Sequence, residues 1–545
     1  MRDRLSTLAP EQDLVVIGGG INGAGVARDA ALRGLRVVLL DKNDFAAGTS
    51  SKTSKLVHGG LRYLEHGALR LVWEACRERR ILLHTAPHLV RPLPFVFPLY
   101  DDSRVSPWRL RAGMWLYDML SAFRNVHRHR MLGLRRADQW REGLRREGLR
   151  TLALYYDAWM DDARLVLANV VAAREAGAAT LNYTAVTRVL TRDGKVEGVE
   201  ATAQNGETLR LRAPIVVVCA GPWTNALLAT LPHASRPVAA TRGTHIVVRQ
   251  MVNQGFTLAA GVDGRIFFVL PWHGQTLIGT TDLADDGDAD AVAATAGEVD
   301  YLLAAANHYF PDAGLGHSDV IATFAGLRPL RATSGATSAR PREHDVLEPA
   351  PGLFCVVGGK YTTYRAVAEE VVNRVVRRLG RRSRCRTATT ALPGGAVPWG
   401  PRQHWEEGPL WQKAVADCVE KTGLPPLTVQ HLWRVYGTRA DRVLALAREV
   451  PHGDRPLCPH FPHITAEVLF ALREEMAWSL EDWFFRRSRM AYAPCHGLDA
   501  VPHVANLYAA ELAWTAQQRA NAIANLQAQI EATSLTPLLR ASSRS

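Results

Sequence analysis

Cysteine is scarce in this chain, and long apolar runs do not occur. The seven cysteines are scattered, odd in number and without a C-x-x-C pair, so we expect neither a disulfide framework nor a metal site, and a reducing compartment. No run of about 18 apolar residues could span a bilayer. The mixed-charge start has no apolar core, so we also expect no signal peptide. Any membrane contact should therefore be peripheral.

Lysine is equally rare: it supplies only seven of the 65 basic residues, so 58 are arginine. The formal net charge of +12 suggests an anionic partner, such as nucleic acid, lipid headgroups or a phosphorylated metabolite. However, coding bias also produces an arginine excess of this size, which weakens arguments from charge. The positions of the few lysines are more informative.

Low-complexity tracts and internal repeats are absent too. The chain has 545 residues, of which 47% are hydrophobic and 22% are charged, as in ordinary globular proteins. This length predicts roughly two to four domains.

A β-turn-α-turn-β unit opens the chain. The apolar run 13–17 ends in GGGINGAG, a helical stretch follows at 22–32, and a second apolar run at 36–40 ends in Asp41. Such a unit, with an acidic residue after its second strand, is typical of dinucleotide binding. Because the acid would repel a 2′-phosphate, it also argues against NADP.

Each glycine of the motif has a physical role. Gly18 permits the tight turn, Gly20 lets the backbone approach a pyrophosphate, and Gly23 lets helix and strand pack closely. The helix start then attracts the diphosphate, and Asp41 accepts hydrogen bonds from a ribose. The motif alone does not distinguish NAD from FAD.

The segment 42–64 (KNDFAAGTSSKTSKLVHGGLRYL) concentrates polar side chains. It holds three of the seven lysines, Lys42, Lys52 and Lys55, together with His58 and Arg62. A polar surface loop is the plain alternative. A binding segment beside the dinucleotide motif is the interpretation that we favour.

Two segments, GGGINGAGVARDAALRGL and GTSSKTSKLVHGGLRYLE, together resemble the respiratory, aerobic FAD-dependent glycerol-3-phosphate dehydrogenases. Further blocks follow in the family's order over roughly residues 12–370: YYDAWMDDARLVLANV, VVVCAGPWTNAL, GTHIVV, IGTTD, AGLRPL and VVGGKYTTYR. The resemblance implies an oxidoreductase, a flavoprotein of glycerol metabolism. It also implies FAD contacts at Gly18, Gly19, Gly20, Asn22, Gly23, Asp41, Thr49, Ser50, Ser54, Lys55, Gly221, Gly359 and Thr362.

The implied reaction oxidises sn-glycerol 3-phosphate to dihydroxyacetone phosphate by hydride transfer to FAD, with electrons passing to a membrane quinone. The phosphate needs cations, and arginine forms two parallel hydrogen bonds with it. A histidine suits removal of the hydroxyl proton. The family motifs imply Arg62, Tyr63, Arg328, Arg342 and Lys360 as substrate-binding residues, and His58, His245, Arg328 and Lys360 as catalytic residues.

Some of these assignments have alternatives. The segment around Arg342 diverges from the family, so its alignment could slip to Arg340. His58 could simply cap a turn, His245 could be a satisfied core histidine, and Tyr63 suits packing better than contact with substrate. Which histidine is the base is left open.

The predicted fold class is α/β: an FAD-binding Rossmann-like domain interleaved with a mixed β-sheet substrate domain, plus an all-α C-terminal domain. We expect the interleaved region at 1–395 and the helical domain, with a disordered tail, at 396–545. The FAD motifs lie at 13–65, 215–225 and 353–380, and the substrate roof mainly at 66–150 and 230–345.

Two rival functions remain. An FAD-dependent glycerol-phosphate or amine oxidase would pass its electrons to oxygen, and a non-catalytic nucleic-acid-binding protein would use the basic charge. The latter lacks a compact basic motif with interleaved aromatics, so we expect no nucleic acid. We expect a cytoplasmic protein, peripheral on the inner face of the cytoplasmic membrane, with the arginine-rich segment 66–150 facing headgroups or solvent. The oligomeric state is open, a homodimer included.

Overall fold

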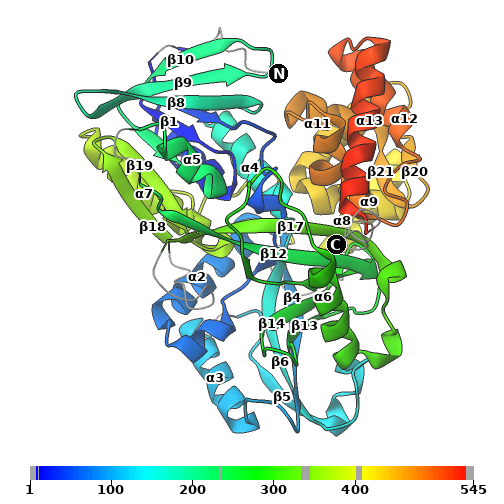
Figure 1. The fold of residues 1–545 in the computed structure, drawn as a ribbon. Coiled ribbons are helices and arrows are strands. Elements are labelled where there is room, and N and C mark those ends of the chain that lie inside the picture. The colour runs from blue at the N-terminus through cyan, green and yellow to red at the C-terminus, as the bar shows by residue number, and fades with distance from the viewer. Residues whose placement is uncertain are drawn as a thin grey trace.

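Two large sheets, a smaller three-stranded sheet and a mainly helical C-terminal region with one hairpin make up the described part of the protein (Figure 1). The computed structural model describes residues 8–9, 11–123, 125–231, 235–332, 344–399 and 408–535, except the side chains of Arg62, Glu65 and His66. The predicted tail after residue 535 lies outside this range. Among the described residues, no helix combines the length and apolar character that crossing a membrane requires.

The first sheet has six strands and is parallel except at one edge, where β18 and β19 are antiparallel. Its order is β18 (His344–Ala350), β19 (Leu353–Gly358), β11 (Val216–Val218), β1 (Leu14–Ile17), β2 (Val37–Leu40) and β7 (Ala179–Leu181). All four residues of β1 are buried, because both faces of the sheet are covered.

Different elements cover the two faces. One face packs against α1 (Ile21–Leu32), α4 (Asp162–Glu175) and α7 (Tyr364–Arg378). The other packs against a three-stranded sheet of β8 (Thr184–Arg192), β9 (Lys195–Ala203) and β10 (Thr208–Arg212). The short α5 (Thr224–Leu228) follows β11.

The second sheet has ten strands and is mixed. Strand β13 runs parallel to β4, whereas all other strand pairs of this sheet are antiparallel. Its strands are β3 (Leu56–Val57), β4 (Val90–Tyr100), β5 (Arg130–Gly133), β6 (Leu149–Met160), β12 (Val238–Arg249), β13 (Gly255–Ala259), β14 (Ile266–Trp272), β15 (Gln275–Gly279), β16 (Leu283–Ala284) and β17 (Val320–Arg331). Helix α6 (Ala296–Tyr309) packs on this sheet. Helices α2 (Leu69–Thr85) and α3 (Pro107–Leu120) lie beside it, at the lower left of Figure 1.

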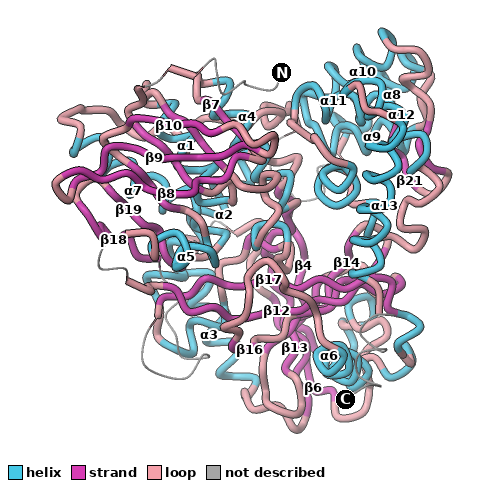
Figure 2. Tube along the Cα trace, turned by 45° about the horizontal axis from the view of Figure 1, so that its top comes forward, coloured by secondary structure: helices cyan, strands magenta, loops and turns pink. Residues whose placement is uncertain are grey.

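The C-terminal region stands to one side of both sheets (Figure 1 and Figure 2). Its helices are α8 (Pro409–Thr422), α9 (Pro426–Tyr436), α10 (Ala440–Glu449), α11 (Thr465–Glu474), α12 (Val501–Leu512) and α13 (Ala516–Thr533). A small hairpin, β20 (Pro456–Cys458) and β21 (Phe461–Ile464), interrupts them. The predicted fold class is confirmed, and this hairpin is the one departure from an all-helical C-terminal region among the described residues.

Buried ion pairs join the C-terminal region to the six-stranded sheet. Arg164 of α4 donates two hydrogen bonds to Glu475, at 2.6 and 2.8 Å. Asp44, just after β2, accepts hydrogen bonds from both Arg486 and Arg487. Because breaking a buried pair is costly, these contacts hold the two regions in one arrangement.

Candidate functional site

A cavity of about 630 Å³ lies where the two sheets meet. Strands β1, β11 and β19 are neighbours in the six-stranded sheet, and the segments that follow them line the cavity. The long strands β12 and β17 of the ten-stranded sheet line it from the other side. The carboxyl ends of parallel strands are where open α/β sheets bind their ligands.

The glycine turn after β1 is as compact as its sequence predicts. Gly18 has φ = +100°, and a Cβ on it would lie 2.5 Å from the Cys219 carbonyl oxygen. A Cβ on Gly23 would lie 1.8 Å from the Gly18 oxygen. Helix α1 is capped by Gly20, which has no side chain to cover the helix start. This end of α1 therefore fits an anionic group.

Asp41 stands at the end of β2 and lines the cavity. Its carboxylate accepts hydrogen bonds from the backbone N–H groups of Gly19, at 2.6 Å, and Asn43, at 2.8 Å. Burial raises the pKa of Asp41 to about 6. The acidic residue is thus fixed beside the glycine turn, where a ribose hydroxyl would reach it.

Four hydroxyl residues of the segment after β2 line the cavity: Thr53 and the three predicted FAD contacts Thr49, Ser50 and Ser54. Ser50 Oγ accepts a hydrogen bond from the N–H of Ile21, at 3.0 Å. Thr49 Oγ1 donates to the carbonyl of Leu327, at 2.6 Å. The segment is therefore attached to both sheets.

Lys55 differs from its neighbours, because its side chain does not line the cavity. Its ammonium group donates to both carboxylate oxygens of Asp162, at 2.9 and 2.7 Å, and to the Ser51 carbonyl, at 2.7 Å. Both side chains of the pair are at most 5% exposed. This corrects the expected cofactor contact: Lys55 forms a buried ion pair that supports the binding segment from behind.

Replacing Lys55 with methionine should therefore lower stability more than it lowers FAD binding. The variant leaves the Asp162 carboxylate buried without its cation, which costs about 3–5 kcal/mol. Urea denaturation would measure the loss in the free energy of unfolding. Lys55→Met/Asp162→Leu should recover part of it. A variant of native stability that lacks FAD would contradict this assignment.

The other expected cofactor residues fall into two groups. Asn22, Gly221 and Gly359 line the cavity together with Gly18 and Gly20. Gly19, Gly23 and Thr362 lie just behind its wall and shape it. Thr362 Oγ1, for example, bonds the backbone of His58 at 3.2 and 3.3 Å.

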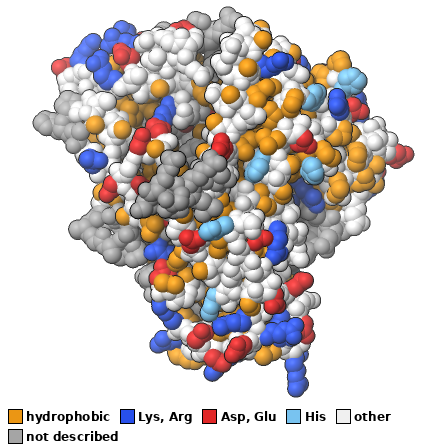
Figure 3. Space-filling model, turned by 45° about the vertical axis from the view of Figure 1, so that its right-hand side comes forward, with side chains coloured by type: hydrophobic (Ala, Val, Ile, Leu, Met, Phe, Trp, Pro, Cys, Tyr) orange, Lys and Arg blue, Asp and Glu red, His pale blue; other side chains and the backbone are white. Residues whose placement is uncertain are grey.

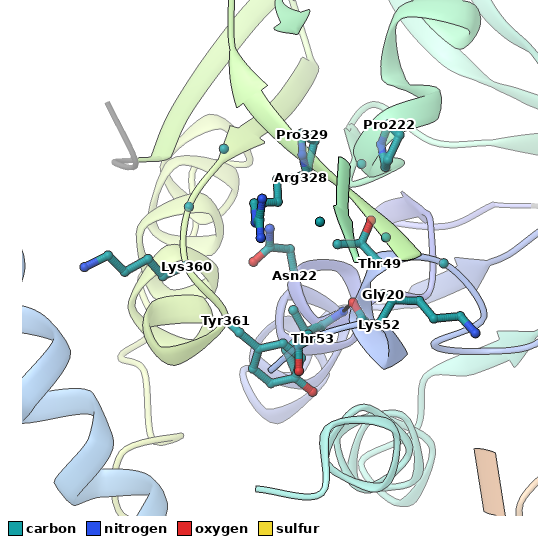
Figure 4. A pocket seen from close by; sticks show the side chains of 18 of the residues that line it. Gly20, Asn22, Thr49, Lys52, Thr53, Pro222, Arg328, Pro329, Lys360 and Tyr361 are labelled. Atoms are coloured by element: carbon teal, nitrogen blue, oxygen red, sulfur yellow. Dashed lines mark hydrogen bonds between the residues drawn. The ribbon is translucent and has the colours of Figure 1, made fainter. Parts of the chain in front are cut away.

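Arg328 enters the cavity from β17 (Figure 4). Its guanidinium donates to Asp282, at 2.9 Å, to the hydroxyl of Thr280, at 2.9 Å, and to the Thr281 carbonyl, at 3.1 Å. Gly243 on the paired strand makes room, since a Cβ there would lie 2.3 Å from the guanidinium. The cation is therefore held in a fixed orientation.

Lys360 also lines the cavity, at the turn between β19 and α7. Its ammonium group lies 3.5 Å from the centre of the Tyr63 ring, a cation–π contact. Figure 4 shows Lys360 and Lys52 extending in opposite directions. Lys52 reaches the Tyr492 hydroxyl of the C-terminal region, at 2.9 Å.

Both predicted histidines line the cavity, and His245 is the more tightly held. Its Nε2 lies 2.8 Å from Ser54 Oγ, and its ring stacks on Phe324 with centroids 5.0 Å apart. Burial, with the cations Arg328 and Lys55, lowers the pKa of His245 well below its ordinary value. His58 tilts against Phe268, with ring centroids 6.4 Å apart.

Two expected substrate residues cannot be placed. The structure does not describe the side chain of Arg62. Arg342 and its alternative, Arg340, also lie outside the described residues. Thr280 and Asp282, which orient Arg328, were not predicted as site residues. Both stand in the IGTTD block directly after β15, where a hydroxyl and a carboxylate at a strand end are a signal for a binding site.

FAD fits the residues present. A diphosphate would meet the glycine turn and the start of α1, and a ribose would meet Asp41. The turn after β19, with Gly358 and Gly359 at φ +71° and +93°, brings backbone without side chains to the wall of the cavity. The part of the cavity that is lined by this turn, His245 and Arg328 suits the redox-active end of the cofactor and a small anionic substrate.

Comparisons with known proteins agree with this geometry. Residues 13–374 match the FAD dependent oxidoreductase family, and residues 385–519 match the C-terminal domain of alpha-glycerophosphate oxidase. The chain is 39% identical over 531 residues to a glycerol-3-phosphate dehydrogenase of Synechocystis sp., covering 93% of this chain and 94% of that protein. It is 38% identical over 495 residues to a D-erythritol 1-phosphate dehydrogenase of Brucella abortus, covering 88% and 94%.

A solved structure extends the likeness to three dimensions. The glycerol-3-phosphate dehydrogenase of Bacillus halodurans complexed with FAD superposes with a TM-score of 0.79 at 29% identity, over 96% of this chain and 95% of the other.

Proposed function

Because the chain belongs to the family of FAD-dependent glycerol-3-phosphate dehydrogenases, we propose that it oxidises sn-glycerol 3-phosphate to dihydroxyacetone phosphate and passes the electrons to a membrane quinone. One observation carries the substrate assignment: a fixed guanidinium, Arg328, and a neutral imidazole, His245, line the same cavity as the glycine turn. A phosphorylated alcohol needs both groups.

FAD, the cofactor, supplies a two-electron acceptor for the hydride of the C2–H bond. The protein binds and orients the substrate. Arg328 binds the phosphate, and its contacts with Asp282 and Thr280 set its orientation before substrate arrives. Lys360 adds a second positive charge to the same cavity. Phe95, Phe97 and Phe268 line the cavity as well and limit its water.

His245 takes the proton of the C2 hydroxyl in this proposal. A base must be unprotonated, and burial keeps the imidazole of His245 neutral. Ser54 Oγ, 2.8 Å from Nε2, fixes the ring and joins it to the cofactor-binding segment, of which Ser54 is part. His58, which borders the same cavity, is the alternative base.

The pH profile tests this role. Because the pKa of His245 lies below the ordinary histidine value of about 6.5, the imidazole stays neutral as the pH falls to that value. The part of the acid-side decline in kcat/KM that depends on His245 should therefore lie below pH 6.5. The phosphate of the substrate also titrates in this pH range, but its titration affects the unaltered protein and a His245→Gln variant equally. The difference between the pH profiles of these two proteins therefore reports on His245 alone. A His245-dependent decline centred above pH 6.5 would refute the assignment.

Anaerobic reduction tests the function itself. Glycerol 3-phosphate should bleach the visible flavin absorbance of the purified protein without oxygen, and a quinone analogue should restore it faster than oxygen does. Faster recovery with oxygen would instead identify an oxidase. If an amino acid bleaches the flavin and glycerol 3-phosphate does not, the substrate is wrong.

A longer polyol phosphate is a second candidate substrate, because a relative that is 38% identical is named D-erythritol 1-phosphate dehydrogenase. The same cation and base would serve either substrate. Comparing kcat/KM for the two substrates in one preparation decides between them.

Peripheral membrane contact fits an apolar surface on α2, α3 and the turn after α3. Six large side chains there are 43–69% exposed: Leu69, Trp73, Trp108, Trp115, Met119 and Phe123. Arginines stack on three of these rings: Arg77 on Trp73, Arg109 on Trp108 and Arg128 on Phe123. Tryptophan with neighbouring arginine is typical of helices that lie in the headgroup layer.

Replacing Trp108 and Trp115 with alanine should weaken binding to anionic phospholipid vesicles at least about tenfold, because each indole would otherwise bury apolar surface in the interface. Sedimentation with vesicles measures the bound fraction. Leu427→Ala, at a side chain 70% exposed on the C-terminal region, is the matched control. Equal binding of all three proteins would remove this surface from the proposal.

A further inference from the structure

Three side chains that commonly bind metals meet beside the hairpin of the C-terminal region. The Sγ atoms of Cys458 and Cys495 and a ring nitrogen of His460 all lie within 4.8 Å of one another. Cys458 Sγ lies 3.4 Å from His460 Nδ1 and accepts a hydrogen bond from the His460 backbone N–H, also at 3.4 Å. The two cysteines are 37 residues apart in sequence, so only the fold brings them together.

Asp499 completes the group. Its Oδ2 lies 3.9 Å from His460 Nδ1, and its carboxylate also interacts with the Cys458 thiol. Cys458 is buried, whereas the side chains of His460 and Asp499 are 64% and 38% exposed. An ion could therefore reach the group from solvent and be held from the buried side. Figure 3 shows one face of the molecule, with histidine side chains exposed in its upper part.

We propose that Cys458, His460 and Cys495, with Asp499 as fourth ligand, bind a Zn²⁺ ion. Two sulfur atoms, one imidazole and one carboxylate are the donor types that tetrahedral zinc takes in proteins. On binding, each of the two thiols loses a proton to solvent and becomes a thiolate ligand. The site would connect the β20–β21 hairpin to the segment before α12 and so stabilise the C-terminal region.

The electrostatics of the group favour a cation. The Asp499 carboxylate lies 3.9 Å from His460 Nδ1, and the two thiols and a ring nitrogen of His460 lie within 4.8 Å of one another. A divalent ion would stabilise the thiolate forms.

A second cluster of possible ligands, His431, His463 and Glu467, is less suited to an ion. Its carboxylate already accepts hydrogen bonds from the Ile464 backbone N–H, at 2.8 Å, and pairs with both histidines, at 2.8 and 3.2 Å. Glu467 is fully buried. These three side chains therefore satisfy one another, and they contain no thiol.

Metal analysis of the full-length, FAD-loaded protein tests the proposal. After incubation with zinc and removal of unbound ion, we expect one zinc per chain. Cys458→Ser/Cys495→Ser should contain almost none. Cys418→Ser, which removes a buried thiol of α8 in the same region, should keep its zinc.

Because Cys458 is buried, its variant could fail to fold, so His460→Ala provides a second test at an exposed position. It should weaken zinc binding at least about tenfold in competition with a chromophoric chelator. Cobalt bound to the unaltered protein should show a thiolate-to-metal charge-transfer band.

Three results would overturn the proposal: no zinc in the unaltered protein, zinc retained by the double cysteine variant, or a Cys458–Cys495 disulfide in protein isolated without oxidant. Zinc that is retained by the double variant but lost in His463→Asn would move the site to the buried histidine cluster.

Discussion

Replacing Arg328 with alanine should lower kcat/KM for glycerol 3-phosphate about 10²- to 10³-fold, or about 3–4 kcal/mol, by removing the cation that faces the phosphate. Arg328 is a strong candidate because its guanidinium is only partly exposed and is oriented by Asp282 and Thr280. FAD should remain bound, because the glycine turn is untouched. Steady-state kinetics and the ratio of flavin to protein absorbance measure the two effects separately.

Two further variants make this test specific. Arg331→Ala removes an arginine three residues along the same strand, where the side chain is 56% exposed and pairs with Asp345, and should leave the kinetics unchanged. Arg328→Lys keeps the charge but not the planar fork, so it should recover only part of the loss. If Arg328→Ala has normal kinetics, another residue binds the phosphate.

Gly18→Ala should yield protein with almost no bound FAD. Gly18 has φ = +100°, which strains any residue with a Cβ, and that Cβ would lie 2.5 Å from the Cys219 carbonyl oxygen. The turn cannot rotate to escape, because the Gly18 carbonyl packs against Gly23. The backbone N–H groups that would receive the diphosphate must then move. Flavin content per chain, after removal of free FAD, measures the effect.

Gly34→Ala is the matched control. Gly34 also has a positive φ, +80°, but no atom lies within 4 Å of its added Cβ. It should cost only about 1–2 kcal/mol of stability and keep its FAD. If Gly18→Ala keeps as much FAD as Gly34→Ala, the close packing at Gly18 does not control FAD binding, contrary to our expectation.

The cofactor half of the site was predictable because its residues are close in sequence. Gly18, Gly20, Gly23 and Asp41 belong to one β-turn-α-turn-β unit, in which local geometry brings the turn and the acid together. The apolar runs at 215–219 and 353–357 likewise form β11, which pairs with β1, and β19, which pairs with β11, as strands ending in glycine predict.

The remaining site depends on contacts that no local pattern encodes. The polar segment after β2 holds Lys55 among hydroxyl residues that line the cavity. Lys55 itself has a φ of +58°, and its side chain forms a buried ion pair with the carboxylate of Asp162, which is over 100 residues away in sequence. Asp282 orients Arg328 from the connection between β15 and β16. Burial decides which charged groups pair, and sequence spacing does not reveal it.

The sequence by itself determined the α/β fold class, the dinucleotide motif and the resemblance to flavin-dependent dehydrogenases, because each rests on short-range periodicity or on contiguous motifs. Only the tertiary structure decided which of the scarce residues act together. Of the seven lysines, three line the cavity and one supports it from behind, and of the seven scattered cysteines, two meet beside a histidine. Such groupings arise because packing brings distant segments together.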